Sequence, residues 1–120
     1  MQDRFRFRVY YKPHNKVYNV ICLNCDRQKE IIIEYKGSTA IVEWENCEII
    51  QSTGLKDKNG KLIYEGDIVE RENVQGKKRG VVEFNENLLH FRATNMSLFS
   101  LIHRAEVIGN IYENKDLLDD

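Results

Sequence analysis

The sequence predicts a mostly-β protein built on an antiparallel, strongly curved sheet or small barrel, with one or two short helices. Two patterns carry this prediction. Aromatic and β-branched residues recur at every second position more often than at helical spacing. Strand-like runs separated by turn residues follow one another at intervals of about ten residues. The chain of 120 residues has room for one domain with its own core.

The N-terminal half is typical of a meander of strands. Residues 5–11 alternate apolar side chains with basic or polar ones, and the fixed φ of Pro13 starts a turn. Residues 17–23 then form the returning strand of a hairpin. Three further short strands are expected, at residues 31–35, 40–44 and 48–51. A helical turn around residues 43–46 fits nearly as well.

The C-terminal half begins with a tight hairpin. Asn59-Gly60 tolerates positive φ at both central positions of a type I′ turn, so residues 55–56 should face residues 62–63. Gly66 then allows a sharp entry into a long curved strand from Asp67. A basic loop is expected at residues 73–79, followed by strands at residues 80–84 and 89–94. A helix at residues 97–104, a closing strand at residues 107–112 and a final turn at residues 114–118 complete the half.

Charge and composition exclude several classes of partner. The chain has 18 basic and 19 acidic residues, a net charge of -1, so nucleic acid or an anionic membrane would have to be met by a local patch. No window approaches the roughly 18 apolar residues of a membrane span, and the start lacks the pattern of a secretory signal. We therefore expect a cytoplasmic protein with its three cysteines reduced.

Three blocks of sequence closely resemble the YopX family of bacteriophage and prophage proteins. Residues 52–69 carry the family's signature, residues 106–118 resemble its C-terminal motif, and residues 5–10 its N-terminal one. Lys115 stands where proline is usual, and Tyr10 where tryptophan is frequent.

The resemblance implies one YopX-like domain over residues 1–120, with an SH3-like or pseudo-barrel C-terminal half. Any internal seam is expected near residues 52–54. A phage or prophage origin and a location in the bacterial cytoplasm are also implied. The family supplies no catalytic residues that could be transferred to this chain.

Metal and cofactor sites are weakly indicated. Cys22 and Cys25 have the spacing of half a zinc site or a redox dithiol, but a second ligand pair is missing and a helix N-terminus is not expected there. We favour Cys22 and Cys47 as small apolar residues of the core, with Cys25 exposed in a turn. Asp57 and its neighbours fail as a calcium loop at both ends. No metal and no cofactor are expected.

Catalysis is not expected either. The histidines and carboxylates form no local constellation of base and nucleophile. Glu65 and Asp67 flank Gly66 in a fixed turn, and we favour their hydrogen bonding to turn amides over a catalytic role.

Two basic clusters are candidates for nucleic-acid binding. Arg4, Arg6 and Arg8 share one face of a strand at a spacing close to that of phosphates, and residues 77–79 add Lys77, Lys78 and Arg79. Tyr10, Tyr18, Tyr35 or Phe91 could stack on bases. The alternative, which we favour, is that the arginines pair with acids such as Glu30, Glu34 or Glu43, or protect a sheet edge.

Protein binding is the favoured function. A small β domain without catalytic groups is expected to occupy a surface of a host or phage protein, or to self-associate along a strand edge. Trp44 is a candidate anchor if exposed, although a lone tryptophan is more often part of the core. A nucleic-acid-binding small barrel is the alternative.

Overall fold

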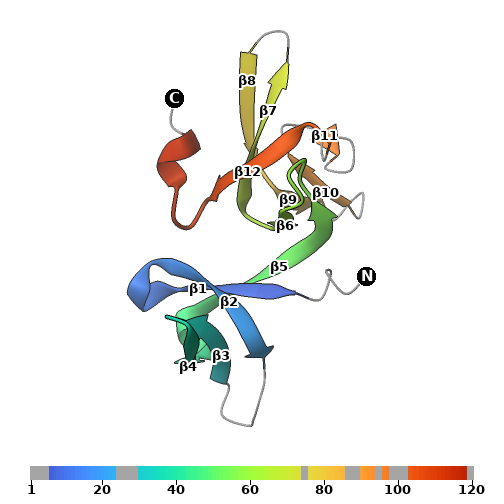
Figure 1. Cartoon of the computed structure of the whole chain (residues 1–120). Helices are drawn as coiled ribbons and strands as arrows, with labels where there is room; N and C mark the ends of the chain where they lie inside the picture. The colour runs from blue at the N-terminus through green and yellow to red at the C-terminus, as the bar shows by residue number, and fades with distance from the viewer. Residues whose placement is uncertain are drawn as a thin grey trace.

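The chain forms two lobes joined by one long strand. A computed structural model describes residues 6–23, 30–73, 76–85, 90–93, 96–97 and 103–118. Figure 1 shows the lobes one above the other. The radius of gyration is 15.2 Å, whereas a compact globule of this length would have about 13.6 Å. The two-lobed arrangement accounts for this elongation.

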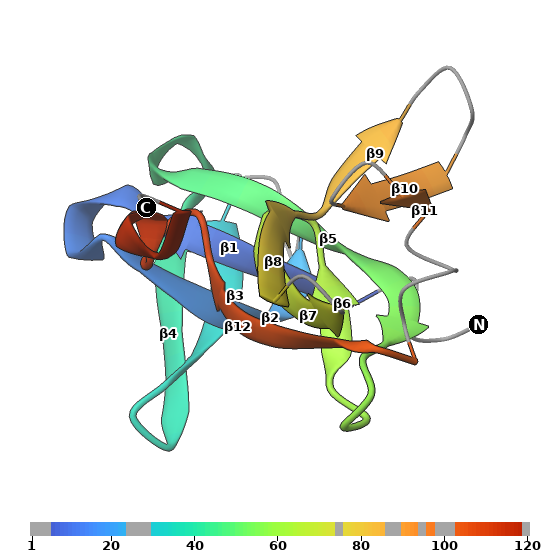
Figure 2. The ribbon, with the colours of Figure 1, turned by 90° about the horizontal axis from the view of Figure 1, so that it is seen from above.

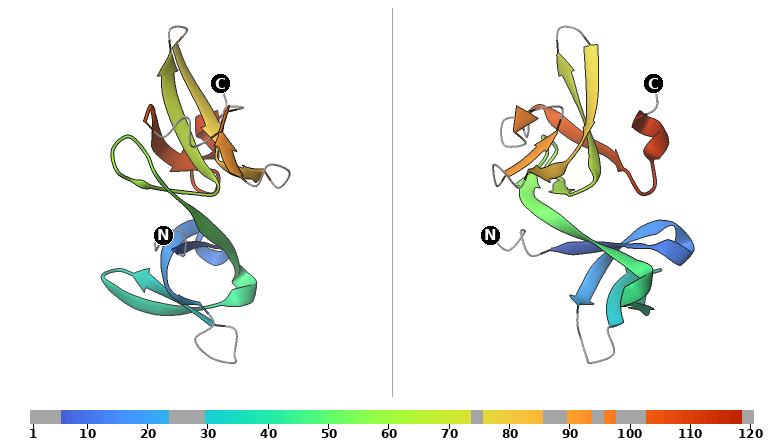
Figure 3. Two further views of the ribbon diagram at one scale, coloured as in Figure 1. Left: turned by 90° about the vertical axis from the view of Figure 1, so that its right-hand side faces the viewer. Right: turned by 180° about the vertical axis from the view of Figure 1, so that it is seen from behind.

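The N-terminal lobe is a curled antiparallel meander, seen from two sides in Figure 3. Its strands are β1 (Phe7–Tyr11), β2 (Lys16–Leu23), β3 (Glu30–Tyr35) and β4 (Ser38–Glu43), which pair in the order β4-β3-β2-β1. Because side chains alternate between the two faces of a strand, Val9, Ile31, Ile33 and Val42 point inward and form one buried cluster. Short 3₁₀ helices at Lys12–His14 and Trp44–Asn46 close the turns.

Strand β5 (Cys47–Lys56) belongs to both lobes. Its first half pairs with β1, and its second half pairs with β6 (Leu62–Tyr64) on both sides of an irregularity between Ser52 and Lys56. Gly54 lies within this irregularity at φ +80°, a backbone conformation that glycine adopts without steric cost. The sequence predicted two separate short strands here. A single strand instead passes through residues 52–54 and changes its partner.

The C-terminal lobe consists of two small antiparallel sheets beside β6, which Figure 2 shows from above. Its strands are β7 (Asp67–Asn73), β8 (Gly76–Val81), β9 (Glu83–Asn85), β10 (His90–Ala93), β11 (Met96–Ser97) and β12 (Ala105–Asn110). They pair in the orders β12-β7-β8 and β11-β10-β9. A second buried cluster holds this lobe together and contains Ile63, Val69, Val82 and Ala105.

The mostly-β, antiparallel class predicted from the sequence is confirmed. Within the described ranges, however, the strands do not close into a barrel, and the helical elements are short 3₁₀ helices, the last at Lys115–Leu118. Most of the helix expected at residues 97–104 lies outside the described residues. Among the described helical segments, none has the length and apolar character needed to cross a membrane.

The hairpin turn before β6 differs from the predicted type I′ turn. A type I′ turn requires positive φ at both Asn59 and Gly60. Here only Gly60 has positive φ, at +84°, and Asn59 does not. Gly60 N–H donates to the Asp57 carbonyl at 3.0 Å, and Asp57 N–H donates to the Lys61 carbonyl at 2.8 Å. This pattern is typical of a longer loop whose glycine makes a bulge. The predicted position of the turn is confirmed, but the predicted type I′ geometry was wrong.

The basic segment expected as a loop is largely strand. β7 extends to Asn73 and β8 begins at Gly76, with Glu72 opposite Lys77 and Glu70 opposite Arg79. Opposite charges across a strand pair stabilise the pairing. The basic residues therefore prolong the hairpin instead of forming a flexible tip.

Candidate functional site

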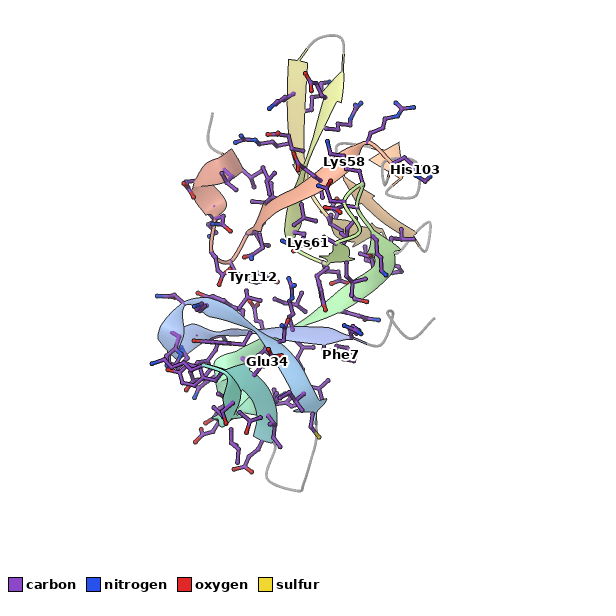
Figure 4. The ribbon with its side chains drawn as sticks, in the orientation of Figure 1. Phe7, Glu34, Lys58, Lys61, His103 and Tyr112 are labelled. Atoms are coloured by element: carbon purple, nitrogen blue, oxygen red, sulfur yellow. The ribbon has the colours of Figure 1, made fainter. Side chains whose placement is uncertain are left out.

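A groove separates the two lobes. Two adjoining cavities of about 560 and 430 Å³ lie between them, and Arg8, Asn19 and Glu34 border both. Figure 4 shows Lys61 and Tyr112 where the lobes face each other, with Glu34 on the lobe below. We call this space the interlobe groove.

Arg8 sits in the groove as part of the contact between lobes. Its guanidinium carbon lies 4.0 Å from the centre of the Tyr64 ring, and its Nε donates to Asn19 Oδ1 at 3.1 Å. A cation over an aromatic face is a favourable contact. Arg8 thus joins β2 of the N-terminal lobe to β6.

Asp67 lies behind the same contact and is almost fully buried. Its Oδ2 accepts the N–H of Tyr64 at 2.8 Å, as expected from the sequence for a carboxylate in this turn. Burial raises the pKa of Asp67 to about 6, although the Tyr64 hydrogen bond and the charges of Arg8 and Lys61 oppose the rise. The carboxyl group of Asp67 therefore holds the turn through its hydrogen bond to Tyr64 N–H, and its pKa is well above that of an exposed aspartate.

A second contact between lobes involves the turn after β12. The rings of Tyr10 and Tyr112 stack with centroids 5.1 Å apart, and Glu113 Oε2 accepts the N–H of Val17 at 2.8 Å. Gly66 is required beside this contact, since a Cβ there would lie 2.9 Å from the Tyr112 ring. The two lobes are thus held together by specific pairs beside the groove, Arg8 with Tyr64 and Tyr10 with Tyr112.

The outer face of the N-terminal sheet carries a row of isoleucines, of which Ile21 and Ile41 are exposed and Ile32 is half-buried. Ile32 on β3 is directly opposite Ile41 on β4, and Ile21 occupies the irregularity in β2 beside Cys22, the partner of Ile32. The side chains of Ile21 and Ile41 are 55% and 62% exposed. We call Ile21, Ile32 and Ile41 the isoleucine row. Ile21 also borders the interlobe groove.

Glutamates flank the isoleucine row on both sides. Glu30 is directly opposite Glu43, and Glu34 is opposite Thr39. The alternation of the strands places these side chains on the same outer face as Ile32 and Ile41. Within the described part of the chain, none of the three carboxylates forms a salt bridge. The surface is therefore apolar in the middle and acidic at its margins.

The arginines predicted to share a strand face are placed differently. Arg4 lies outside the described residues, Arg6 is exposed just before β1, and Arg8 is half-buried in the lobe contact. Arg8 bonds an asparagine and not one of the expected glutamates, because the outer face of β1 is turned toward the other lobe. The structure does not present Arg8 as a free cation.

The second basic cluster is held by an acid from its own hairpin. Arg79 Nε lies 2.8 Å from Glu70 Oε2, Lys77 Nζ lies 3.6 Å from Glu70 Oε1, and Lys78 is exposed. Arg79 also donates to the carbonyl of Leu117 at 2.9 Å. The hydrogen bond from Arg79 lowers the pKa of Glu70. Lys77 and Arg79 thus fasten β8 to β7, and Arg79 also joins β8 to the C-terminal turn.

The aromatic residues proposed as stacking platforms are engaged with one another. His14 Nδ1 and Tyr18 Oη are 2.8 Å apart, and the rings of Tyr18 and Tyr35 meet edge to face at 5.7 Å. Tyr10 is stacked on Tyr112. Phe91 is in a strand, and its side chain lies outside the described part. Trp44 is half-buried and packs against the N-terminal core, which is the core role weighed against an anchor.

The cysteines differ from one another. Cys47 is a free thiol packed against the N-terminal core, as predicted, and burial raises its pKa. Cys22 is disulfide-bonded, so the expectation of a reduced thiol was wrong for this residue. It is half-buried and lies at the irregularity in β2, opposite Ile32. Cys25 lies outside the described residues.

Sequence reasoning missed the isoleucine row. Residues 31–33 are three isoleucines, which we interpreted as one apolar strand without assigning Ile32 to the opposite face. The alternation of Thr39, Ile41 and Glu43 was the available signal, since two polar residues share a face with one isoleucine. The pairing of Glu30 with Glu43 required the strand register.

Comparisons with known proteins agree with this description. The family model described as YopX protein matches residues 6–119. A crystal structure of protein EF1440 from Enterococcus faecalis is similar, with a TM-score of 0.62 and 23% sequence identity over 94% of this chain and 96% of that chain. The comparison with curated proteins found no match. The structural likeness shows a shared fold, and the family match covers nearly the whole chain, which therefore belongs to the YopX family.

Proposed function

We propose that this protein is a non-enzymatic binding module that holds another protein on the isoleucine row. The observation that carries the proposal is the exposure of Ile21 and Ile41, at 55% and 62%, on one face with Ile32 between them. Contiguous exposed apolar side chains with a polar rim are typical of protein interaction sites. Fully burying an exposed isoleucine contributes about 1.5–3 kcal/mol, and Ile21 and Ile41 are each a little over half exposed, so the row would supply about 2–4 kcal/mol of the about 8 kcal/mol of a micromolar contact.

The family relationship supports a role in phage or prophage biology. We propose that the protein works in the bacterial cytoplasm as an accessory protein and that its partner is a host or phage protein, for example one of replication, transcription or defence. The internal contacts of Arg8, Lys77 and Arg79 favour this function over nucleic-acid binding. A phosphate would have to compete with each of these contacts.

The test compares a double variant of the isoleucine row with a single isoleucine replacement on the other face of the sheet. Ile21→Thr/Ile41→Thr retains β-branched side chains and should change the free energy of unfolding by about 0.5 kcal/mol or less per site, as at other exposed positions. Ile49→Thr is the control, since Ile49 is 36% exposed on β5 opposite Val9. We expect the affinity of the double variant for a specific partner to be about 10–100-fold lower than that of wild type.

The measurement is quantitative mass spectrometry of proteins that co-purify from the bacterial host with tagged wild type, the double variant and Ile49→Thr. A partner present with wild type and Ile49→Thr but depleted with the double variant supports the proposal. Equal recovery of every protein with all three chains would contradict it.

A further inference from the structure

Strand β4 is an open sheet edge without the usual protection. It is the last strand in the order β4-β3-β2-β1-β5-β6, and in the described part of the chain it pairs with β3 alone. Its residues Ser38–Glu43 include no lysine and no proline, and all six pair with β3 in regular register. Natural edge strands usually carry such residues or a bulge to prevent another strand from pairing. β4 therefore offers backbone groups for strand addition.

The like charges beside this edge have no explanation in the isolated fold. Glu30 and Glu43 are directly opposite each other on the outer face, and a cross-strand pair of like charges is destabilising. Glu34 lies on the same face, opposite Thr39. A cation placed between Glu30 and Glu43 would turn this repulsion into attraction. The charge pattern thus selects a basic partner.

We propose that β4 and the isoleucine row bind an extended basic peptide segment of the partner by strand addition. The proposal rests on the proposed function and specifies the chemistry of the partner. A strand added to β4 places every second side chain on the face of Ile41. The residue opposite Ile41 is apolar, and the residues two positions before and after it lie opposite Thr39 and Glu43.

The flanking positions take lysine or arginine. Opposite Glu43, the cation reaches both Glu43 and Glu30. Opposite Thr39, which is short, a long cationic side chain extends across β4 toward Glu34 on the next strand, because neighbouring strands are about 4.8 Å apart. The segment therefore has the pattern basic, any, apolar, any, basic.

The test uses a defined probe, a fluorescein-labelled peptide Ser-Thr-Lys-Thr-Ile-Thr-Lys-Thr-Ser, and a matched peptide with glutamate in place of both lysines. Fluorescence anisotropy at low salt should show binding of the lysine peptide and at least tenfold weaker binding of the glutamate peptide. Glu30→Gln/Glu43→Gln should weaken the lysine peptide by about 3–10-fold. Glu72→Gln/Glu106→Gln makes the same change of net charge on the C-terminal lobe and should leave binding unchanged.

Backbone pairing is tested by N-methylation. Only alternate residues of an added strand hydrogen-bond to β4, so methylating one alternating set of amides should abolish binding while methylating the other set is tolerated. Equal effects of the two sets would overturn strand addition, and equal binding of the lysine and glutamate peptides would overturn the basic specificity.

Glu43→Lys gives an independent readout. Because Glu30 would then face a lysine, the melting temperature should rise by about 2–4 °C, while binding of the lysine peptide should fall at least tenfold. A fall in melting temperature, or undiminished binding, would contradict the assigned charge pattern.

If a cellular partner depends on Ile21 and Ile41 but the lysine peptide does not bind, the peptide chemistry is overturned and the binding module stands. If no partner depends on them, the proposed function itself fails.

Discussion

Replacing Asp57 by alanine is expected to lower the free energy of unfolding by about 3–5 kcal/mol, the largest effect of a single side chain outside the apolar cores. The carboxylate is buried, with 7% of the residue exposed. Oδ1 accepts the N–H groups of Asn59 and Lys61, and Oδ2 accepts that of Val107, each at 2.9 Å. Hydrogen bonds to a charged group contribute about 1.5–3 kcal/mol each, and removing the acceptor leaves amides unsatisfied.

Urea unfolding followed by circular dichroism measures this loss. Lys58→Ala is the control, because Lys58 is exposed on the same turn and such sites change stability by about 0.5 kcal/mol or less. Asp57→Asn should fall between the two, since it retains one acceptor oxygen. A loss below about 1 kcal/mol for Asp57→Ala would show that the turn and β12 do not depend on this carboxylate.

The second large effect is a decrease of stability with rising pH that comes from Asp67. The pKa of Asp67 in the folded protein is about 6, against an ordinary value of 3.8, because burial disfavours the charged carboxylate. The folded state therefore holds the proton more tightly than the unfolded chain. The contribution of this group is fully present below pH 3.8 and is lost as the pH rises through about 6. The difference of about two pKa units corresponds to about 3 kcal/mol.

Asp67→Asn isolates this contribution, because the amide keeps an acceptor for Tyr64 N–H and does not titrate. We expect the unfolding free energy of the variant, relative to wild type, to rise by about 2 kcal/mol between pH 4 and pH 7. Asp116→Asn controls for the loss of one exposed carboxylate. Parallel pH profiles of wild type and Asp67→Asn would show that Asp67 titrates normally.

The sequence predicted local features better than contacts between lobes. The alternation of apolar and polar residues located β1 to β4. The apolar positions of this pattern include Val9, Ile31, Ile33 and Val42, which form the buried face. The turn at Gly60 and the pairing of Lys56 with Leu62 were also readable, although the buried Asp57 changed the type of turn.

The candidate site depends on register and on distant partners. Arg8 alternates with apolar residues as a phosphate-binding arginine would. Its guanidinium, however, stacks on the ring of Tyr64 from the other lobe. The same basic segment that was expected as a loop is paired because Glu70 faces Arg79 across nine residues of sequence. Ile41 and Glu43 are visible in the sequence, whereas the opposition of Glu30 to Glu43 exists only once β3 and β4 are aligned.

The continuity of β5 makes the two lobes thermodynamically interdependent. Ile50, in its first half, is buried beside β1, and Ser52 and Thr53, where its partner changes, are buried as well. Thr53 Oγ1 donates to the Ile63 carbonyl at 2.8 Å. Neither lobe can unfold without removing a hydrogen-bonded neighbour from the other. We therefore expect the two small cores to unfold in one cooperative transition, in which case a peptide that stabilises β4 would also stabilise the distant β7–β8 hairpin.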